Sequence, residues 1–267
     1  MKNFKRVFCI VMVCMLSMVL LAGCSQNENV LKVATNAEFP PFEEIQDGEY
    51  VGFDMDLIRL IGEKLGYEVQ IDNMEFDSVV GSLPAGTHNV AISGLTITPT
   101  RSKSVDFSDS YNETAQILIV KSDDTMFTGT DKATLDEQLK NKRIGVCIGF
   151  TGEKYANGDD ELGYAAIEGA EVTSFDNVSL AVTELKNGNL DVIIMDDTVA
   201  KNVAESDANK ADVKVIDIPL TTEYYAIAVK KGNTELKDKI NEALKEIKDS
   251  GKLDELIDTW GIKEVNE

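Results

Sequence analysis

The sequence is poor in the residues that build metal sites and disulfides. It has four cysteines and one histidine, His88, and three of the cysteines precede position 25. Cys147 is the only cysteine in the remainder, so an internal disulfide there is excluded. No His, Cys and Asp residues cluster at metal-ligand spacing. We therefore predict neither a metal site nor a bound cofactor.

Basic residues are scarce as well. Lys and Arg total 26 against 47 Asp and Glu, and removal of residues 1–23 leaves 23 basic and 47 acidic residues, a net charge of −24. A surface of this sign repels nucleic acid and anionic lipid, so a nucleic-acid partner is excluded. The acidic residues are spread along the chain and 43% of all residues are hydrophobic, which is typical of a globular protein.

The one long apolar run lies at the start of the chain. Three basic residues within the first six precede an apolar run over 7–22, which ends in Leu-Ala-Gly-Cys at 21–24. The run is shorter than the roughly 20 apolar residues that cross a bilayer, and small residues follow it. It therefore predicts a secretory signal over residues 1–23 rather than a membrane-spanning helix. Residues 24–29 are polar without periodicity, and we expect a flexible tether there.

From residue 30 on, strand-like and helix-like patterns alternate. Residues 31–35 and 69–71 are short β-runs, and apolar residues recur at helical spacing over 54–65. A second helical stripe covers 234–260, with a break at Ser250-Gly251. This alternation predicts an α/β fold with mainly parallel sheets.

Two segments about a hundred residues apart share a pattern. The first begins at Phe76 and the second at Phe175, and each predicts a helix capped by the following aspartate, a glycine stop and a buried strand. Gly94 and Asp196 stand two residues past the matched isoleucines, at strand ends, where open α/β sheets bind ligands. We therefore predict two similar lobes that face a shared cleft. Chance similarity of such short patterns is the alternative.

Several short motifs resemble known receptors. The Leu-Ala-Gly-Cys segment resembles the lipobox of bacterial lipoproteins, in which the cysteine, here Cys24, carries the lipid anchor. The rest of the chain resembles the polar amino-acid-binding family of ABC transporter solute-binding proteins (bacterial extracellular solute-binding protein family 3) in its lipoprotein form. The motifs that carry this resemblance are NAEFPPF at 36–42, GFDMD at 52–56, SGLTITPTR at 93–101, VDFSD at 105–109, GFTGE at 149–153 and DDTVA at 196–200.

The resemblance implies a two-lobed periplasmic-binding-protein-like fold of type II, in which two crossing strands act as a hinge. The crossings are expected near 110–114 and 218–223. Lobe 1 then comprises residues 30–112 and 221–267, and lobe 2 comprises 113–220. The internal repeat agrees with this division, since one copy falls in each lobe.

A free amino acid carries a carboxylate and an ammonium group, and each needs a partner when it leaves water. The resemblance assigns the carboxylate to Arg101, whose guanidinium can donate two parallel hydrogen bonds. Thr96 and the backbone N–H of Thr151 are expected to support it. The ammonium is assigned to Asp196, with the carbonyl of Gly94 as a second acceptor.

The rest of the predicted ligand-binding set encloses the side chain. Phe39 and Phe76 match positions where aromatic rings in the family pack on the ligand's side-chain stem, and Ser93 belongs to the same set. Asp197 is an alternative to Asp196 as the ammonium ligand, but the alternation of the strand and the register of the repeat both favour Asp196.

The motifs define ligand specificity less well. Asn36, the last member of the predicted set, stands where basic-amino-acid receptors carry an aspartate, and an amide cannot neutralise a buried cation. Glu38 and Asp54 lie nearby in the sequence and could supply that charge. Cys147 falls where the glutamine receptor has a lysine, and Phe150 replaces the family's usual threonine in the lobe 2 loop. We expect a neutral polar ligand such as glutamine, with lysine or arginine as the alternative.

Together these features predict an extracytoplasmic, lipid-anchored monomer that binds a polar amino acid by hinge closure and delivers it to the permease subunits of an ABC importer. An amino-acid-sensing module with a signalling partner would use the same binding chemistry and stays an alternative. A dehydratase-like enzyme on the same fold is another. Catalysis by Cys147 with His88 as base needs contact between them, and they fall in different predicted lobes. We therefore predict that the chain is not an enzyme.

Overall fold

A computed structural model describes residues 29–263 of the chain. The predicted signal peptide, Cys24 and the rest of the predicted tether up to residue 28 lie outside the described residues. Within the described residues, the chain from Leu31 onward forms one compact unit, which contains the helices and sheets below except for Val30, the first residue of β1.

The first of two five-stranded sheets has the strand order β5-β1-β6-β13-β7. β1 and β6 run parallel, with Val33 opposite Val90, whereas β13 runs antiparallel to β6 and β7. The buried apolar runs of β1 and β13 suit strands that are covered on both faces of the sheet. The strands are β1 (Val30–Thr35), β5 (Glu68–Asn73), β6 (Val90–Ala91), β7 (Val105–Thr114) and β13 (Glu223–Lys230).

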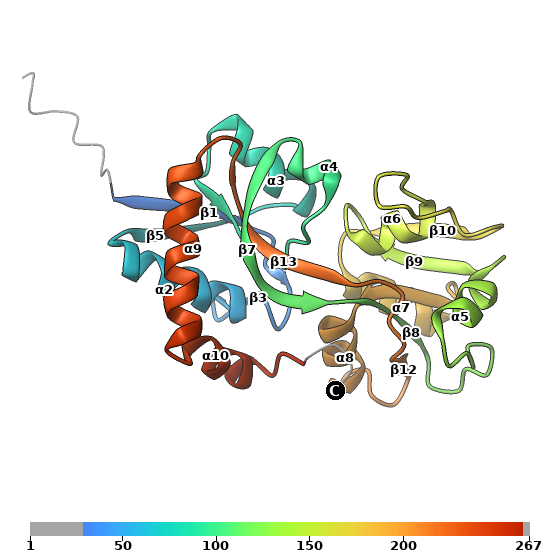
Figure 1. Cartoon of the computed structure of the whole chain (residues 1–267). Helices are drawn as coiled ribbons and strands as arrows, with labels where there is room; N and C mark the ends of the chain where they lie inside the picture. The colour runs from blue at the N-terminus through green and yellow to red at the C-terminus, as the bar shows by residue number, and fades with distance from the viewer. Residues whose placement is uncertain (1–28, 264–267) are drawn as a thin grey trace, which may run out of the picture. The chain divides into compact units, whose positions relative to one another are not determined.

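We call this sheet and the elements around it lobe 1. Helices α2, α9 and α10 pack against one another, and α3 contacts β6 and β13 (Figure 1). The predicted break at Ser250-Gly251 separates α9 from α10, and the apolar stripe of α9 is buried as its helical spacing predicts. The elements are α2 (Phe53–Leu65), α3 (Phe76–Ala85), α4 (Pro99–Ser102), α9 (Thr234–Asp249), α10 (Lys252–Trp260) and a small sheet of β2 (Glu38–Phe39), β3 (Glu43–Gln46) and β4 (Glu49–Val51).

The second five-stranded sheet, with its helices, forms lobe 2. Its strand order is β10-β9-β11-β8-β12, with β9 parallel to both neighbours and β8 antiparallel to both of its own. Helices α6 and α7 contact β9 and β11, and α8 contacts β8 and β12. The elements are β8 (Gln116–Lys121), β9 (Arg143–Cys147), β10 (Glu171–Phe175), β11 (Val192–Asp196), β12 (Val213–Ile216), α5 (Lys132–Leu139), α6 (Thr151–Asn157), α7 (Val178–Asn187) and α8 (Asp197–Glu205).

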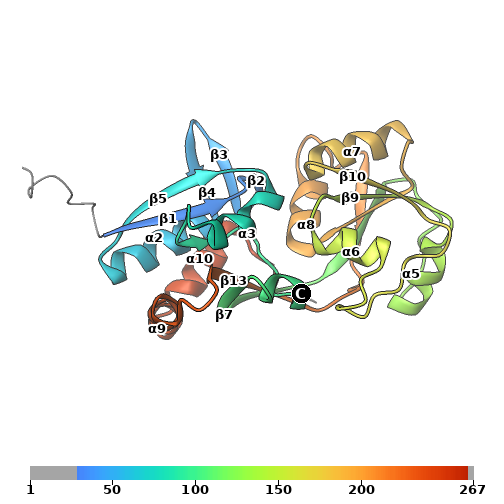
Figure 2. The same ribbon diagram turned by 90° about the horizontal axis from the view of Figure 1, so that it is seen from above.

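The chain crosses between the lobes twice. Only Ala115 separates β7 from β8, and the return passes through 217–222 between β12 and β13. Figures 1 and 2 show β7 and β13 side by side at this connection, and Thr114 pairs with Glu223 there. The two-lobed α/β fold is therefore confirmed. The boundaries assigned to the lobes stay a prediction.

The prediction of mainly parallel sheets is wrong, because both sheets are mixed. The two crossings explain the difference. The chain enters lobe 2 along β8 and returns to lobe 1 along β13. Each of these strands therefore runs antiparallel to a neighbouring strand of its sheet, β8 to β11 and β13 to β6.

The two copies of the internal repeat occupy equivalent places, α3 to β6 in lobe 1 and α7 to β11 in lobe 2. Both helices end at the predicted glycines, Gly86 and Gly188, which adopt the left-handed conformation that favours glycine. The predicted aspartate caps are wrong. Asp77 lies inside the first turn of α3, and α7 is capped by Asn177, whose side chain accepts a hydrogen bond from the N–H of Leu180.

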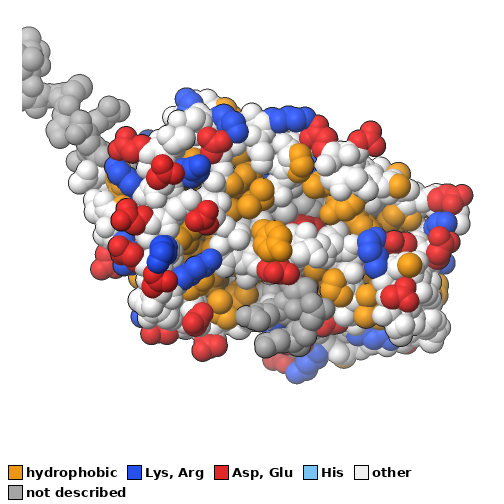
Figure 3. All heavy atoms as spheres, viewed as in Figure 1, with side chains coloured by type: hydrophobic (Ala, Val, Ile, Leu, Met, Phe, Trp, Pro, Cys, Tyr) orange, Lys and Arg blue, Asp and Glu red, His pale blue; other side chains and the backbone are white. Residues whose placement is uncertain are grey.

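Acidic and basic side chains are interspersed over the visible surface (Figure 3). This distribution agrees with the spread of charge along the sequence. Within residues 29–263, no helix is long and apolar enough to cross a membrane. Nor does the same part of the chain bring three or more His, Cys, Asp or Glu side chains together in a way that could hold a metal ion.

Candidate ligand-binding site

A small cavity lies between strand ends of the two lobes. Its volume is about 10 Å³, roughly what one water molecule requires. Seven of the nine predicted ligand-binding residues line it, and the eighth lining residue is one that was not in the predicted set. The lining residues are Phe39, Phe76, Gly94, Thr96, Arg101, Phe150, Thr151 and Asp196. An amino acid is much larger than this cavity, so its binding requires the walls to move apart.

Arg101, on the short helix α4, reaches both lobes. Its guanidinium donates to the carbonyl of Thr96 in lobe 1 at 2.8 Å and to the carbonyl of Gly149 in lobe 2 at 3.0 Å. Burial lowers the pKa of Arg101 to about 10, although Glu223 and Asp196 act against this shift. The side chain therefore stays charged at neutral pH. A guanidinium has five donors, so the two bonds leave others for a ligand carboxylate.

Asp196 ends β11 and is almost fully buried. The hydroxyl of Tyr225 donates to its Oδ2 at 2.5 Å. Burial, followed by the charge of Glu223, raises the pKa of Asp196 to about 7. A cation placed beside this carboxyl group would favour its ionised form. Asp196 is therefore suited to receive an ammonium group.

Glu223, at the start of β13, was missed by sequence reasoning. Its carboxylate accepts hydrogen bonds from the hydroxyls of Thr96 at 3.0 Å, Thr151 at 2.6 Å and Thr221 at 2.8 Å. It thus joins lobe 1, lobe 2 and the second crossing through one buried group. Because each hydroxyl has a single proton, Thr96 and Thr151 can donate to a ligand carboxylate either through their backbone N–H groups or after their hydroxyls leave Glu223. The one available signal was an acidic residue within the predicted crossing at 218–223.

Three phenylalanine rings meet at the cavity. The ring of Phe150 contacts that of Phe76, with centroids 4.3 Å apart, and that of Phe39, with centroids 5.3 Å apart. The guanidinium carbon of Arg101 lies 5.3 Å from the centroid of Phe76. An added Cβ at Gly94 would lie 2.6 Å from the Phe39 ring, so only glycine permits this approach. Apolar ring faces therefore enclose one end of the cavity, next to the charged groups.

Asn36 and Ser93 lie outside the cavity lining. The N–H of Asn36 donates to the hydroxyl of Ser93 at 3.0 Å, and the amide of Asn36 donates to the carbonyl of Met74 at 3.0 Å. Ser93 in turn donates to Glu43 at 2.9 Å. These bonds tie together the segments that follow β1 and β6. In this structure both residues support the site rather than line it.

Asp54, one of the carboxylates considered as a partner for a cationic ligand, is already engaged. It accepts hydrogen bonds from the N–H of Gly94 at 2.8 Å and from the hydroxyl of Tyr111 at 2.8 Å. Burial raises the pKa of Asp54 to about 6, and burial together with the charge of Asp54 raises the pKa of Glu43 well above its usual range. Burial therefore favours the protonated form of both carboxyl groups, and Asp54 fixes Gly94 from inside lobe 1.

Cys147 and His88 do not form a catalytic pair. His88 lies in lobe 1, where its ring nitrogens contact the hydroxyl of Thr87 at 3.0 Å and the carboxylate of Asp72 at 3.2 Å. Cys147 ends β9 in lobe 2, and burial raises the pKa of its thiol far above its usual range. An activated cysteine needs the opposite shift.

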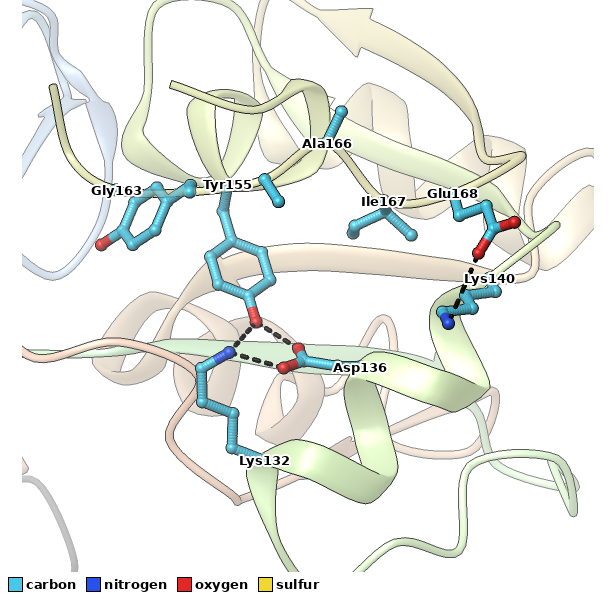
Figure 4. A pocket seen from close by; sticks show the side chains of 10 residues that line it. Lys132, Asp136, Lys140, Tyr155, Gly163, Ala166, Ile167 and Glu168 are labelled. Carbon is cyan, nitrogen blue, oxygen red and sulfur yellow. Dashed lines mark hydrogen bonds and ion pairs between the residues drawn. The ribbon is translucent and has the colours of Figure 1, made fainter. Parts of the chain in front are cut away.

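A larger pocket of about 550 Å³ lies in lobe 2 beside α5 (Figure 4). Lys132 contacts Asp136 at 2.7 Å and the hydroxyl of Tyr155 at 2.5 Å, and Lys140 pairs with Glu168 at 3.5 Å. The cations that line this pocket are therefore already neutralised by carboxylates. None of the predicted ligand-binding residues lines it, so size alone does not make it the candidate site.

Residues 31–263 match the family model of the bacterial extracellular solute-binding proteins, family 3. The chain belongs to this family. The family predicted from the sequence motifs is thus confirmed. The description of family 3 as extracellular also agrees with the predicted extracytoplasmic location.

Individual members of family 3 are similar over most of their length. A probable histidine-binding protein of Neisseria gonorrhoeae is 32% identical over 240 residues, which cover 88% of this chain and 84% of the relative. ABC transporter arginine-binding protein 1 of Escherichia coli is 33% identical over 241 residues, covering 89% and 93%. Two solved structures show an ancestral arginine-binding protein, one bound to arginine and one bound to glutamine. The arginine-bound structure is 39% identical to this chain with a TM-score of 0.76, and the glutamine-bound structure is 38% identical with a TM-score of 0.74. Each match covers 87% of this chain and 98% of the solved chain. All are binding proteins, which agrees with the prediction that the chain is not an enzyme.

Proposed function

We propose that the chain is the receptor of a bacterial ABC importer and binds a polar amino acid between its lobes by hinge closure. The observation that carries this proposal is the cavity in which Arg101 and Asp196 meet the rings of Phe39 and Phe76. It offers a cation for a carboxylate, a carboxylate for an ammonium group, and apolar surface for a side-chain stem. The transporter role is supported by the name of the Escherichia coli relative.

Among polar amino acids we favour a cationic one, arginine above all, over glutamine. Among the described residues, Arg101 is the one cation that lines the cavity, whereas Asp196 lines it and Glu223 is buried next to it. A zwitterionic main chain adds no net charge, so a neutral ligand leaves an excess negative charge in a poorly solvated site. A cationic side chain balances that charge. Asn36, the reason to expect a neutral ligand, has its amide engaged with Met74.

Calorimetry of the soluble chain from residue 25 onward against each of the twenty amino acids tests this function. We expect arginine to bind most tightly. Agmatine, which is arginine without its carboxylate, serves as the control and should bind far more weakly, because Arg101 then has no partner. If none of the twenty amino acids binds, the proposed function is wrong. Tightest binding of glutamine would retain the function and reject the charge argument.

We also propose that a lipid on Cys24 anchors the receptor to the membrane, on the strength of the Leu-Ala-Gly-Cys segment at 21–24. Acyl chains hold a protein at a membrane because each buried methylene contributes about 0.8 kcal/mol, and two chains give stable anchoring. The strongly acidic chain has no comparable attraction of its own for anionic lipid.

Cys24→Ala should therefore move the protein from the membrane fraction to the soluble fraction almost completely. Fractionation of cells, followed by detection with an antibody, measures this shift. Cys14→Ala, which changes a cysteine within the predicted signal and leaves the Leu-Ala-Gly-Cys segment intact, should stay with the membrane. A Cys24→Ala protein that fractionates as the wild type does would reject lipid anchoring.

A further inference from the structure

Phe150 breaks a local rule of helix formation. It is the N-cap residue of α6, with extended backbone and no side-chain hydrogen bond to the helix. In the family pattern that this chain resembles, a threonine usually stands at this position. Its hydroxyl would cap the helix, which stabilises a helix start by about 1 kcal/mol. A residue that gives up a local gain of this kind commonly marks a functional position.

The ring of Phe150 instead packs against two aromatic rings of lobe 1, those of Phe39 and Phe76. Its plane is tilted by 52° to Phe76 and by 77° to Phe39, with the centroid distances given above. Phe150 belongs to lobe 2, so opening of the hinge withdraws its ring from the other two. Closure on a ligand then brings the ring against the ligand's side chain from the opposite lobe.

We infer that Phe150 is a specificity-determining residue, a third aromatic wall that selects a flat, delocalised cation. This inference rests on the proposed function and deepens it. A guanidinium is planar, weakly hydrated and stacks on aromatic faces, whereas the ammonium of lysine is compact and strongly hydrated. Three rings from two lobes therefore favour arginine over lysine and over neutral side chains.

Carboxylates next to this aromatic cluster favour the same cation. A Cβ added to Gly149, the residue before Phe150, would lie 2.2 Å from Oδ1 of Asp77, so the Asp77 side chain packs directly on this loop. Glu38, which precedes Phe39, accepts a hydrogen bond from Asn177 of lobe 2 at 2.8 Å. The rings provide contact area and these carboxylates provide negative potential. A neutral side chain gains the contact area but no attraction to the carboxylates.

Calorimetry on the wild type and on Phe150→Leu tests the inference with arginine and citrulline as probes. Citrulline has the length and shape of arginine but a neutral head group, so the ratio of the two Kd values isolates recognition of the charge. Phe150→Leu keeps apolar volume and removes the ring. We expect it to lower the preference for arginine by about twofold to thirtyfold, the range of one cation–π contact. Phe150→Tyr keeps a ring and should keep the ratio.

Phe150→Thr adds a structurally conservative variant, because it restores the capping hydroxyl, and it should show the same loss of preference. An unchanged ratio in either ring-less variant overturns the role of Phe150 and leaves the proposed function intact. A rise in arginine affinity in those variants overturns it as well, since the ring would then obstruct the ligand. Failure of the wild type to bind any amino acid is a separate result that rejects the proposed function itself.

Discussion

Arg101→Ala should weaken the binding of every amino acid ligand by about two to three and a half orders of magnitude, whatever the side chain. Removal of one partner of a buried ion pair costs about 3–5 kcal/mol, because the other charge is left without a partner, and each 1.4 kcal/mol is about tenfold in affinity. Arg101 is 9% exposed and lies among side chains of both lobes. A carboxylate stranded there has little access to water.

Arg101→Lys separates charge from geometry. It retains a cation but loses the two-pronged donor pattern, so we expect a smaller loss than with alanine. Arg59→Ala is the matched control in the same lobe, because Arg59 is an exposed helix residue that pairs with Asp56 at 3.4 Å. It should bind ligand as the wild type does. Calorimetry measures all three variants, and unchanged affinity in Arg101→Ala would remove Arg101 from the site.

The parts of the fold that sequence could predict are those that local patterning decides. The division between α9 and α10 follows from an apolar stripe interrupted by Ser250-Gly251, and the ends of α3 and α7 follow from glycines in the left-handed conformation. Strand direction was not predictable in this way. A strand has the same alternation whichever way it runs, so the pattern of β8 and β13 did not reveal that they return antiparallel to their neighbours.

For the site as well, the sequence predicted the residues that lie in local motifs and missed those whose role depends on distant partners. The family resemblance named seven of the residues that line the cavity. Six of them lie in the quoted motifs, and the seventh, Phe76, is a single matched position at the start of α3. Glu223 was missed, and Phe150 was noted only as a departure from the family pattern and not as part of the site, because the roles of both depend on partners far away in the sequence. Glu223 meets Thr96 across 127 positions, and Phe150 meets rings of the other lobe. Asp54 has the charge that a cationic ligand needs, but its side chain bonds to Gly94 and Tyr111 inside lobe 1 and does not line the cavity.

Asp196 and Asp197 are adjacent, and the structure gives them different environments. Asp196 lines the cavity and bonds to Tyr225. Asp197 accepts a hydrogen bond from the hydroxyl of Thr114 at 2.9 Å, next to the first crossing, and lies 3.9 Å from the ammonium of Lys201. Asp197→Asn should therefore lower the unfolding temperature, since about 1 kcal/mol corresponds to about 2–4 °C for a chain of this size. It should leave ligand affinity within a few-fold of the wild type.

Asp196→Asn should instead weaken ligand binding by about 100-fold or more, because the ammonium group would enter a buried site without its anionic partner. It should also reduce closure, since a ligand shifts the hinge only to the extent that it binds the closed form better than the open one. Calorimetry measures the affinity, and small-angle scattering with and without arginine measures the compaction. Ligand-induced compaction that survives in Asp196→Asn but disappears in Asp197→Asn would show that Asp197 is the ammonium partner.

The pH dependence gives a second, independent readout of Asp196. Its pKa without ligand is raised to about 7, so below that pH the carboxyl group is mostly protonated, and binding of an ammonium group must displace the proton. Affinity of the wild type should therefore rise as the pH increases from about 5 to about 7 and level off above that, with a slope of at most about tenfold per pH unit. Asp54, with a pKa raised to about 6, also titrates in this range, and its contribution remains in Asp196→Asn. The difference between the pH profiles of affinity for the wild type and for Asp196→Asn is thus the contribution of Asp196. Identical profiles would mean that its carboxylate does not bind the ammonium group.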